Sequence, residues 1–304
     1  MGSPTVTVTR MAQRAMGVTC DVTVVGENGI SVLRDSLARV ARLEALWSRF
    51  LDGSDISRLN RSDGSTTWVS TETVELVRLM IAAHAATDGL FDPTQLPAQL
   101  TDGDRSSRTG EGFDSTTVPG QVSHALAEIE FVDETVLRLP QGLLLDAGGI
   151  GKGLAADMVT SAAVASGAAG VCVNIGGDMR CIGETPDPRG WTVMIGSPDD
   201  YDRRVAGVCL RDGAVATSSL FARRDYGTGT HVYDPRTGLP SAATTTGATV
   251  VAGSAAWAEV FTKYVLLGPR PATFGRLDSM DIGCLAVTHD GEVRTNDAWA
   301  RTAL

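Results

Sequence analysis

The sequence predicts an α+β fold. Short segments of alternating or β-branched residues indicate strands, and longer segments with a helical apolar period indicate helices. The two kinds of segment are interspersed without a repeating βαβ rhythm, which disfavours a doubly wound parallel sheet. The 304 residues are 43% hydrophobic, enough to bury a large core in one big domain or in two packed lobes.

In the first part of the chain, residues 5–10 and 19–26 are typical of two strands. Apolar residues at helical spacing predict a helix over 30–47. A second helix is expected over 71–87, with Ser70 or Thr71 as its N-cap and Gly89 after its end.

The middle and end of the chain alternate between turn-rich and apolar segments. Residues 100–119 are rich in Asp, Ser, Thr and Gly and are interpreted as a mobile loop or lid. The chain from about Asn296 onward is expected to be a short tail. Further strands are predicted at 129–132, 136–139, 142–145, 171–175, 191–195, 206–210, 215–217, 283–287 and 292–294, and further helices at 152–166 and 254–267.

Composition and charge exclude several classes of function. The net charge of −10 and pI near 4.9 disfavour nucleic acid or an anionic membrane as the main partner. No segment has the roughly 20 apolar residues of a transmembrane helix, and no signal-peptide core is evident; a cytoplasmic location is therefore expected. The five scattered cysteines are typical of reduced, mostly buried thiols rather than of a zinc site.

The strongest local motif is the run from Leu145-Asp146 through Gly148-Gly149-Ile150-Gly151-Lys152-Gly153. Glycines let the backbone approach a ligand closely, and a helix N-terminus with one ammonium forms an anion site. The run is neither a Walker A loop nor a Rossmann fingerprint, because Gly153 replaces the metal-binding hydroxyl and the glycine spacing differs. A tight turn with a helix cap is the alternative interpretation.

Several other turns carry residues that could do chemistry. Asn174-Ile175-Gly176-Gly177-Asp178 is typical of a hairpin turn. The Asp-Pro-Arg-Thr-Gly run from Asp234 is rich in residues that favour turns. His231, just before that run, has a side chain whose ordinary pKa near ~6.5 suits a general base, although a lone histidine is more often structural. Phe50 could stack on a flat heterocycle or simply pack in the core.

The order of these motifs resembles the FAD:protein FMN transferase (ApbE-like) family over about residues 10–300. The resemblance implies a single, T-fold-related domain over residues 1–304, built of two packed α/β lobes with the nucleotide site between them. The motifs that carry it are Ala15-Met16-Gly17-Val18-Thr19, Phe50 with residues 54–60, Gly89-Leu90-Phe91-Asp92-Pro93-Thr94, the Asp146–Gly153 run, Asn174–Asp178, Val215-Ala216-Thr217-Ser218 and His231–Pro240.

The resemblance also implies an activity. FAD is the substrate, FMN is transferred through a phosphoester to a Thr or Ser of a partner protein, AMP leaves, and Mg²⁺ at the pyrophosphate is the expected second cofactor. His231 is the implied base for the acceptor hydroxyl, and Lys152 is the second catalytic residue. The residues implied to bind the cofactor are Met16, Phe50, Leu90, Phe91, Asp92, Asp146, Lys152 and His231.

The chain departs from the family pattern at the metal. Where the family presents Asp and, four residues later, Thr to magnesium, this sequence has Glu259 and Lys263. Lys263 could place an ammonium where the cation normally sits, or Thr262 could turn inward and keep a weakened site with the carbonyl of Gly149. A solvated helix face with a Glu259–Lys263 pair is the plain structural alternative.

A second departure is Ser219-Leu220, where the family commonly has Gly-Asp. Three functions therefore stay open at the level of sequence. The first is the transferase, the second is an FAD-binding carrier or interaction module without transfer, and the third is a pyrophosphatase that converts FAD to FMN and AMP.

Overall fold

The computed structural model describes residues 7–101, 123–221, 230 and 232–303, and these form two compact units. Unit 1 comprises Met1–Arg42, Lys152–Ser219 and Thr244–Leu304, and unit 2 comprises Leu43–Gly151 and Leu220–Ala243. Each unit is therefore assembled from segments that are distant in sequence. The predicted loop at 100–119 lies outside the described residues, apart from its first two positions.

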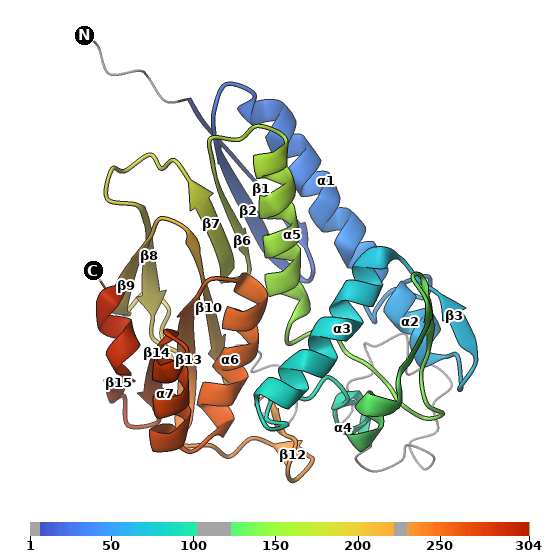
Figure 1. Ribbon diagram of the computed structural model, residues 1–304. Helices are drawn as coiled ribbons and strands as arrows, with labels where there is room; N and C mark the ends of the chain where they lie inside the picture. Colours follow the sequence, from blue (N-terminus) through green and yellow to red (C-terminus); the bar gives the residue numbers. More distant parts are fainter. Residues whose placement is uncertain (1–6, 102–122, 222–229, 231, 304) are drawn as a thin grey trace. The chain divides into compact units, whose positions relative to one another are not determined.

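The core of unit 1 is a sheet of eight strands in the order β1-β2-β6-β7-β10-β13-β14-β15, in which every neighbouring pair is antiparallel (Figure 1). The predicted α+β class is confirmed by this sheet, since no parallel pair occurs in it. Its strands are β1 (Val8–Ala15), β2 (Val18–Val25), β6 (Gly170–Ile175), β7 (Asp178–Gly183), β10 (Gly213–Ser219), β13 (Thr245–Ala252), β14 (Gly283–Thr288) and β15 (Val293–Thr295).

Helices lie along one face of this sheet (Figure 1). Helix α6 (Ala255–Leu267) packs on β10 and β13, and Ser254 caps it by accepting a hydrogen bond from the Trp257 amide. Almost every residue of α6 is buried, which fits a helix that is apolar nearly all round. Three further α-helices lie wholly or mostly in unit 1, namely α1 (Gly29–Trp47), α5 (Gly151–Ala165) and α7 (Arg270–Ser279).

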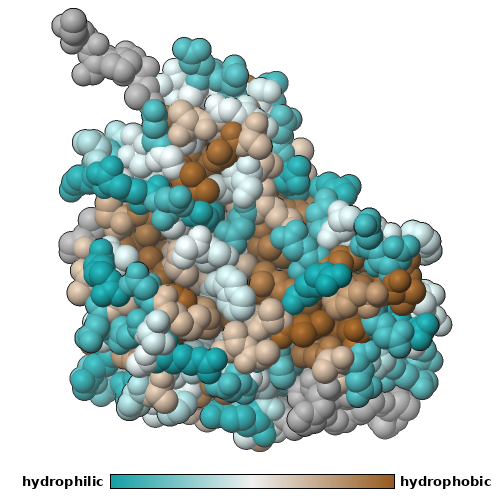
Figure 2. Space-filling model, in the orientation of Figure 1, coloured by the Kyte–Doolittle hydropathy of each residue, from teal (hydrophilic) through white to brown (hydrophobic). Residues whose placement is uncertain are grey.

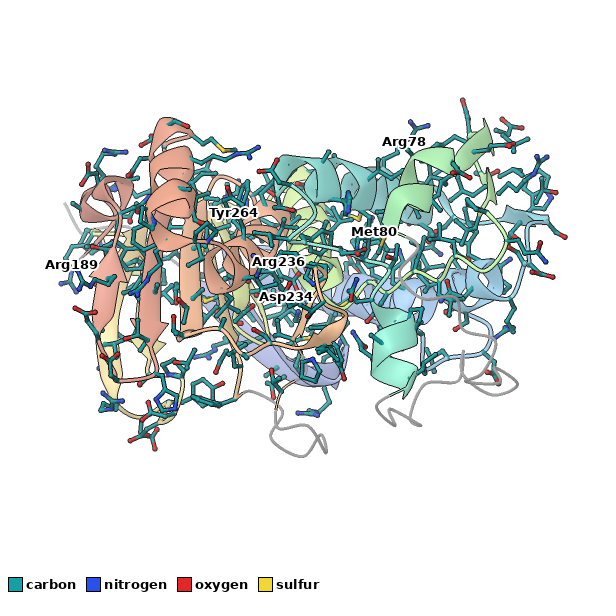
Figure 3. The ribbon with its side chains drawn as sticks, turned by 90° about the horizontal axis from the view of Figure 1, so that it is seen from below. Arg78, Met80, Arg189, Asp234, Arg236 and Tyr264 are labelled. Carbon is teal, nitrogen blue, oxygen red and sulfur yellow. The ribbon has the colours of Figure 1, made fainter. Side chains whose placement is uncertain are left out.

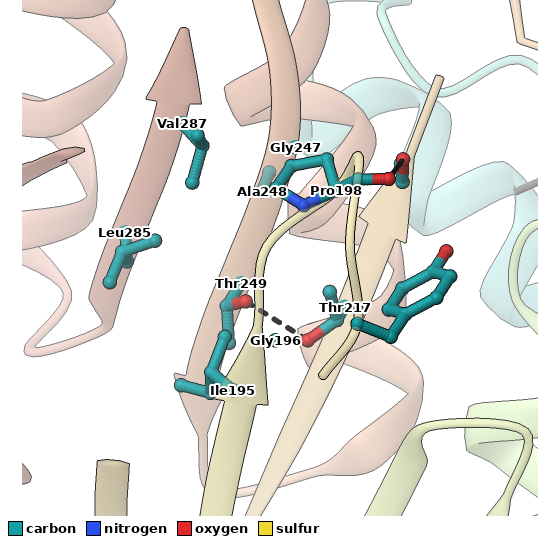
Figure 4. Close-up of a pocket in the computed structure, with 11 residues that line it drawn as sticks. Ile195, Gly196, Pro198, Thr217, Gly247, Ala248, Thr249, Leu285 and Val287 are labelled. Carbon is teal, nitrogen blue, oxygen red and sulfur yellow. Dashed lines mark hydrogen bonds between the residues drawn. The ribbon is translucent and has the colours of Figure 1, made fainter. Parts of the chain in front are cut away.

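A separate hairpin, β8 (Trp191–Gly196) with β9 (Arg204–Leu210), completes the apolar core of unit 1. Trp191 and Val208 pack in one cluster with buried residues of the large sheet and with Trp299. Beyond the end of β8, the ring of Pro198 lies against Gly247 of β13 (Figure 4). A Cβ at Gly247 would lie 2.2 Å from Pro198 Cγ, so only glycine permits this contact.

Unit 2 contains a small sheet in the order β3-β5-β4 and the two-stranded pair β11-β12. Its buried apolar residues include Leu76, Met80 and Leu137. Asp55, buried at the start of α2, accepts hydrogen bonds from Ser70 N at 2.8 Å and Thr73 Oγ1 at 2.7 Å and so joins two helices. The elements are α2 (Asp55–Asn60), β3 (Thr66–Trp68), α3 (Thr71–Ala86), α4 (Leu96–Thr101), η2 (Ser123–Glu128), β4 (Glu130–Asp133), β5 (Val136–Arg138), β11 (Tyr233–Asp234) and β12 (Leu239–Pro240).

Two of the predicted elements are wrong. Residues 142–145 form no strand, because the backbone of Leu145 pairs with the side chain of Asn60 (Asn60 Nδ2 to Leu145 O, 2.9 Å; Leu145 N to Asn60 Oδ1, 2.8 Å). The expected C-terminal tail is ordered as η3 (Asp297–Arg301), in which Trp299 is buried. Asn296 fixes this segment by accepting a hydrogen bond from Cys284 N.

The other predicted helices and strands are confirmed within a few residues, except that the strand expected at 5–10 is β1, which runs from Val8 to Ala15. Of the two residues considered as N-cap of α3, Ser70 is the cap. None of the five cysteines, all of which lie among the described residues, forms a disulfide, and four of them are buried. In the part of the chain that the structure describes, no helix combines the length and the apolar character needed to cross a membrane. The face in Figure 2 shows hydrophobic areas among hydrophilic residues.

Candidate functional site

Four charged side chains of unit 1 meet at the start of α5. Lys152 Nζ lies 2.9 Å from Asp178 Oδ2 and forms a second, shorter ion pair with Glu259 Oε1. Lys263 Nζ lies 3.7 Å from the same Glu259 oxygen. We call Lys152, Asp178, Glu259 and Lys263 the lysine–carboxylate cluster; it joins α5, β7 and α6.

The carboxylates of the cluster are buried, whereas the two lysine side chains are partly exposed. Side-chain exposure is 0% for Glu259 and 4% for Asp178, against 24% for Lys152 and 17% for Lys263. Burying a carboxylate is costly unless it is paired and hydrogen-bonded. Glu259 meets this condition, because Oε2 accepts a hydrogen bond of 2.8 Å from Gly153 N. Within the cluster, the lysine side chains are therefore more exposed than the carboxylates.

Burial and the attraction between opposite charges shift the pKa values of the cluster in opposite directions. Burial would raise the pKa of Glu259, but the ammoniums of Lys152 and Lys263 outweigh it, and the net shift of that pKa is downward. Burial and the nearby charge of Glu259 raise the pKa of Asp178 to about 6. Burial lowers the pKa of Lys263 despite the attraction of Glu259. For Lys152, the carboxylates more than offset burial and raise the pKa.

The first turn of α5 packs directly against the start of α6. A Cβ on Gly153 would lie 2.3 Å from the carbonyl oxygen of Ala255 and 2.7 Å from the Cα of Ala256. Such contacts with backbone leave room for glycine alone. The glycine after Lys152 thus allows the close approach of the two helices through which Glu259 reaches the first turn of α5.

In unit 2, Asp146, which the sequence predicts as an FAD ligand, pairs with Arg49. Asp146 Oδ1 accepts a hydrogen bond of 3.0 Å from Gly148 N, and Oδ2 lies 3.5 Å from Arg49 Nε. Arg49 is buried, and its guanidinium lies 4.3 Å from the centre of the Phe50 ring. The glycine turn that includes Gly149 is therefore held by its own aspartate, as expected of tight turns.

Four further residues predicted to contact the flavin nucleotide differ in their exposure and in their hydrogen bonds. Leu90 and Phe91 are buried in unit 2. Asp92 accepts hydrogen bonds from Thr94 N (2.8 Å) and Gln95 Nε2 (2.7 Å). Phe50 is exposed. These roles in FAD binding stay predictions.

Met16, also predicted to bind the flavin, occupies the turn between β1 and β2 in unit 1. Its φ is 52° and that of Gly17 is 73°. Positive φ at both central residues is what a two-residue type I′ hairpin turn requires, and it is uncommon for a non-glycine residue. The strained position of Met16 is consistent with a functional residue, as observed outliers often are.

The other two predicted turns are both present. Gly176 (φ 63°) and Gly177 (φ 102°) form the turn between β6 and β7. In the β11–β12 turn, Asp234 pairs with Arg236, the two labelled residues near the centre of Figure 3. The hydrogen bonds from Arg236 lower the pKa of Asp234. His231, the predicted base, lies outside the described residues.

The hydroxyl of Thr262, one of the predicted metal ligands, is directed into unit 1. Thr262 Oγ1 donates to the carbonyl oxygen of Glu259 at 2.6 Å and lies 2.6 Å from Ser218 Oγ. Lys263 Nζ donates to the same carbonyl at 3.0 Å. Among the residues that the structure describes, no group of three or more His, Cys, Asp and Glu side chains is arranged to hold a metal ion.

Two residues of these sites were not singled out by the sequence. Asp178 was interpreted only as a turn residue, although it is the second partner of Lys152. Arg49 was overlooked beside Phe50, although it contacts both Phe50 and Asp146. A buried charge has no distinctive local pattern, so only the position of Arg49 within a predicted motif could have indicated it.

Unit 1 is thus an α+β unit built on an antiparallel sheet, with Lys152 in the first turn of α5. The ApbE family model matches residues 16–281, which is most of the chain. The chain belongs to the ApbE family.

Curated relatives and solved structures agree with this family assignment. The chain is 26% identical over 292 residues to the FAD:protein FMN transferase of Klebsiella pneumoniae, covering 89% of this chain and 81% of the relative. It is also 26% identical over 250 residues to the enzyme of the same name from Escherichia coli K12, covering 75% and 69%.

The solved structures share the fold. The crystal structure of the ApbE protein of Thermotoga maritima superposes with a TM-score of 0.84 at 23% identity and covers 97% of this chain and 99% of that one. The flavin transferase ApbE of Vibrio cholerae gives a TM-score of 0.80 at 21% identity, covering 98% and 99%.

Proposed function

We propose that this protein is an FAD:protein FMN transferase that attaches FMN to a Thr or Ser hydroxyl of an acceptor protein and releases AMP. Membership of the ApbE family and the names of the curated relatives support the reaction. The observation that carries the proposal is the lysine–carboxylate cluster, which holds two ammoniums at the start of α5.

The reaction requires positive charge at the transferred phosphorus. The acceptor oxygen bonds to the FMN phosphorus, the bond from that phosphorus to the bridging oxygen breaks, and the oxygen leaves with AMP. Negative charge grows on the phosphoryl oxygens in such transfers and is stabilised by preorganised cations. Lys152 is proposed to supply one such cation, held in place by Asp178 and Glu259.

The acceptor hydroxyl must lose its proton as it attacks. His231 is proposed to take this proton, since a neutral imidazole is a competent base near neutral pH. Met16 and Phe50 are proposed to contact the flavin ring, and Leu90, Phe91, Asp92 and Asp146 to contact the rest of the nucleotide. The exposed ring of Phe50, backed by the Arg49 guanidinium at 4.3 Å, is suited to stacking on an isoalloxazine.

Magnesium is the second cofactor that the family resemblance implies, and the residues of α6 do not fit it. Magnesium takes oxygen ligands, but both oxygens of Glu259 already have partners, and an ammonium cannot ligate a cation. Two unit charges 4 Å apart repel by about 4 kcal/mol at an effective dielectric constant near 20, and a divalent ion beside one ammonium by about twice that. No step of the proposed reaction is therefore assigned to a metal.

Two alternative functions would use the same proposed FAD-binding residues, and one experiment separates them from the transferase. The protein is incubated with FAD and a mixture of Thr- and Ser-containing acceptor peptides, with and without magnesium, and the products are analysed by mass spectrometry. AMP together with FMN covalently bound to peptide supports the transferase. AMP with free FMN would instead indicate a pyrophosphatase, and intact FAD retained by the protein would indicate an FAD-binding module. The location of the protein in the cytoplasm stays a prediction, which cell fractionation can check.

A further inference from the structure

The sequence contains only two lysines, and both belong to the lysine–carboxylate cluster. The other 24 of its 26 basic residues are arginines. Lys152 and Lys263 reach Glu259 from different helices, α5 and α6. The chain therefore uses arginine at every other cationic position and an ammonium only at this place.

The chemistry of an ammonium differs from that of a guanidinium in a way that suits this place. An ammonium is a compact point charge with three donors, whereas a guanidinium is a planar fork that needs more room. A compact cation held by oxygen atoms is also the closest side-chain counterpart of a small metal ion. Lys263 Nζ has that environment, with the Glu259 carbonyl at 3.0 Å and a Glu259 carboxylate oxygen at 3.7 Å.

We propose that the ammonium of Lys263, together with that of Lys152, takes the place of a divalent cation and neutralises the diphosphate of FAD, so that this protein binds FAD without a metal. The inference rests on the proposed function, since it concerns the same nucleotide. It extends that function by assigning the counter-charge to this chain's own residues.

The contacts of the cluster support this assignment. Glu259 is fully buried and bound on both oxygens, so it is saturated by Lys152, Lys263 and the Gly153 amide. The side chains of the two lysines, by contrast, retain some exposure. Lys263 Nζ donates one hydrogen bond to the Glu259 carbonyl and has two further N–H groups with which to reach phosphate oxygens.

The first test measures FAD affinity by flavin fluorescence, in EDTA and in millimolar magnesium. For the wild-type protein, the two dissociation constants should agree within about twofold. Lys263→Thr should bind FAD at least tenfold more weakly in EDTA and should recover affinity when magnesium is added, because threonine offers an oxygen ligand. Lys263→Arg keeps the charge but not the compact shape and should bind more weakly with no response to magnesium.

The second test uses the wild-type protein alone, so it does not depend on the folding of a variant. Brief acetylation of amines followed by peptide mass spectrometry reports on Lys152 and Lys263, with the N-terminal amine as an internal reference. FAD in EDTA should slow acetylation of both lysines at least fivefold and leave the N-terminal amine unchanged.

The outcomes separate the two proposals. Wild-type binding that disappears in EDTA and returns with magnesium overturns the role of Lys263 and leaves the transferase proposal intact. FAD binding in EDTA without any protection of Lys263 also overturns it. A protein that fails to bind FAD in either condition overturns both the inference and the proposed function.

Discussion

Asp157 of α5 accepts a hydrogen bond of 2.7 Å from the hydroxyl of Ser254, the residue that caps α6. The same carboxylate accepts from the amides of Ala255 (2.8 Å) and Ala256 (2.9 Å). One aspartate therefore satisfies the first amides of a neighbouring helix and favourably opposes its dipole. Lys152 lies on α5 and Glu259 on α6. By joining these two helices, Asp157 also helps to hold Lys152 and Glu259 in contact.

Asp157→Ala should destabilise the fold. Removing a capping carboxylate that serves three donors is expected to lower the free energy of unfolding by about 1–3 kcal/mol, measured by urea denaturation. Asp35→Ala is the matched control, because Asp35 is an exposed residue of α1, and it should change stability by less than about 0.5 kcal/mol. Equal effects of the two substitutions would contradict the role of Asp157 as a helix link.

A second prediction concerns the contact of α5 with α6 at Gly153. Gly153→Ala places a Cβ 2.3 Å from the backbone oxygen of Ala255, so the helices must separate, at a cost of about 1–3 kcal/mol. FAD affinity should fall with it, because Lys152 and Glu259 would no longer hold their positions. The measurements are thermal unfolding and flavin fluorescence.

Gly275→Ala in α7 is the control, for which no loss of stability is expected. Outside the backbone of α7 itself, no atom of the described residues lies within 4 Å of a Cβ at Gly275. Alanine is favoured over glycine within a helix by about 1 kcal/mol. This variant should be as stable as the wild-type protein or more so. If both glycines tolerate alanine, the packing argument for Gly153 is wrong.

Much of the fold was predictable because its signals are local. The helical period of α1 and the cap residue Ser70 each depend on neighbours in the sequence. The strand predicted at 142–145 was wrong for a non-local reason. The backbone groups of Leu145 are hydrogen-bonded to the side chain of Asn60, which lies 85 positions away in the sequence. The helix α7 was missed because few of its residues are apolar and only Thr273 and Leu277 are buried.

The candidate site shows the same division between local and distant contacts. Lys152 was identified from the glycine run around it, and Glu259 and Lys263 from the family pattern. The partnership of Lys152 with Asp178 depends on packing β7 beside α5, and no spacing in the sequence specifies that contact. The roles of the predicted FAD and metal residues stay predictions until ligand binding is measured.

Asp178 should make stability depend on pH between about 4 and 6. Its folded pKa of about 6 is above the ordinary 3.8, so the folded protein keeps a proton that the unfolded chain releases in this window. The free energy of unfolding should therefore fall as pH rises, by at most about 3 kcal/mol from this group. Glu259 acts oppositely, because its lowered pKa gives stability that is lost only as the pH falls below its ordinary 4.5.

Asp178→Asn isolates this effect, since the amide has nearly the same shape and does not titrate. The difference in unfolding free energy, variant minus wild type, should rise steadily between pH 4 and pH 6 in urea titrations. A difference that is constant across this window would show that Asp178 does not bind the extra proton.

His231→Ala should abolish FMN transfer while FAD binding changes by less than about twofold. A general base typically contributes a factor of about 10²–10⁴ to the rate, so single-turnover release of AMP in the presence of acceptor peptide should slow by that amount. The dependence of the rate on pH provides a readout that a purely structural role would not move. The wild-type rate should rise through the pKa of a histidine, near ~6.5 when unperturbed, and the residual rate of the variant should lose that step. A variant that transfers FMN as fast as the wild-type protein would remove His231 from the reaction and leave the lysine–carboxylate cluster as the part of the site to examine for another base.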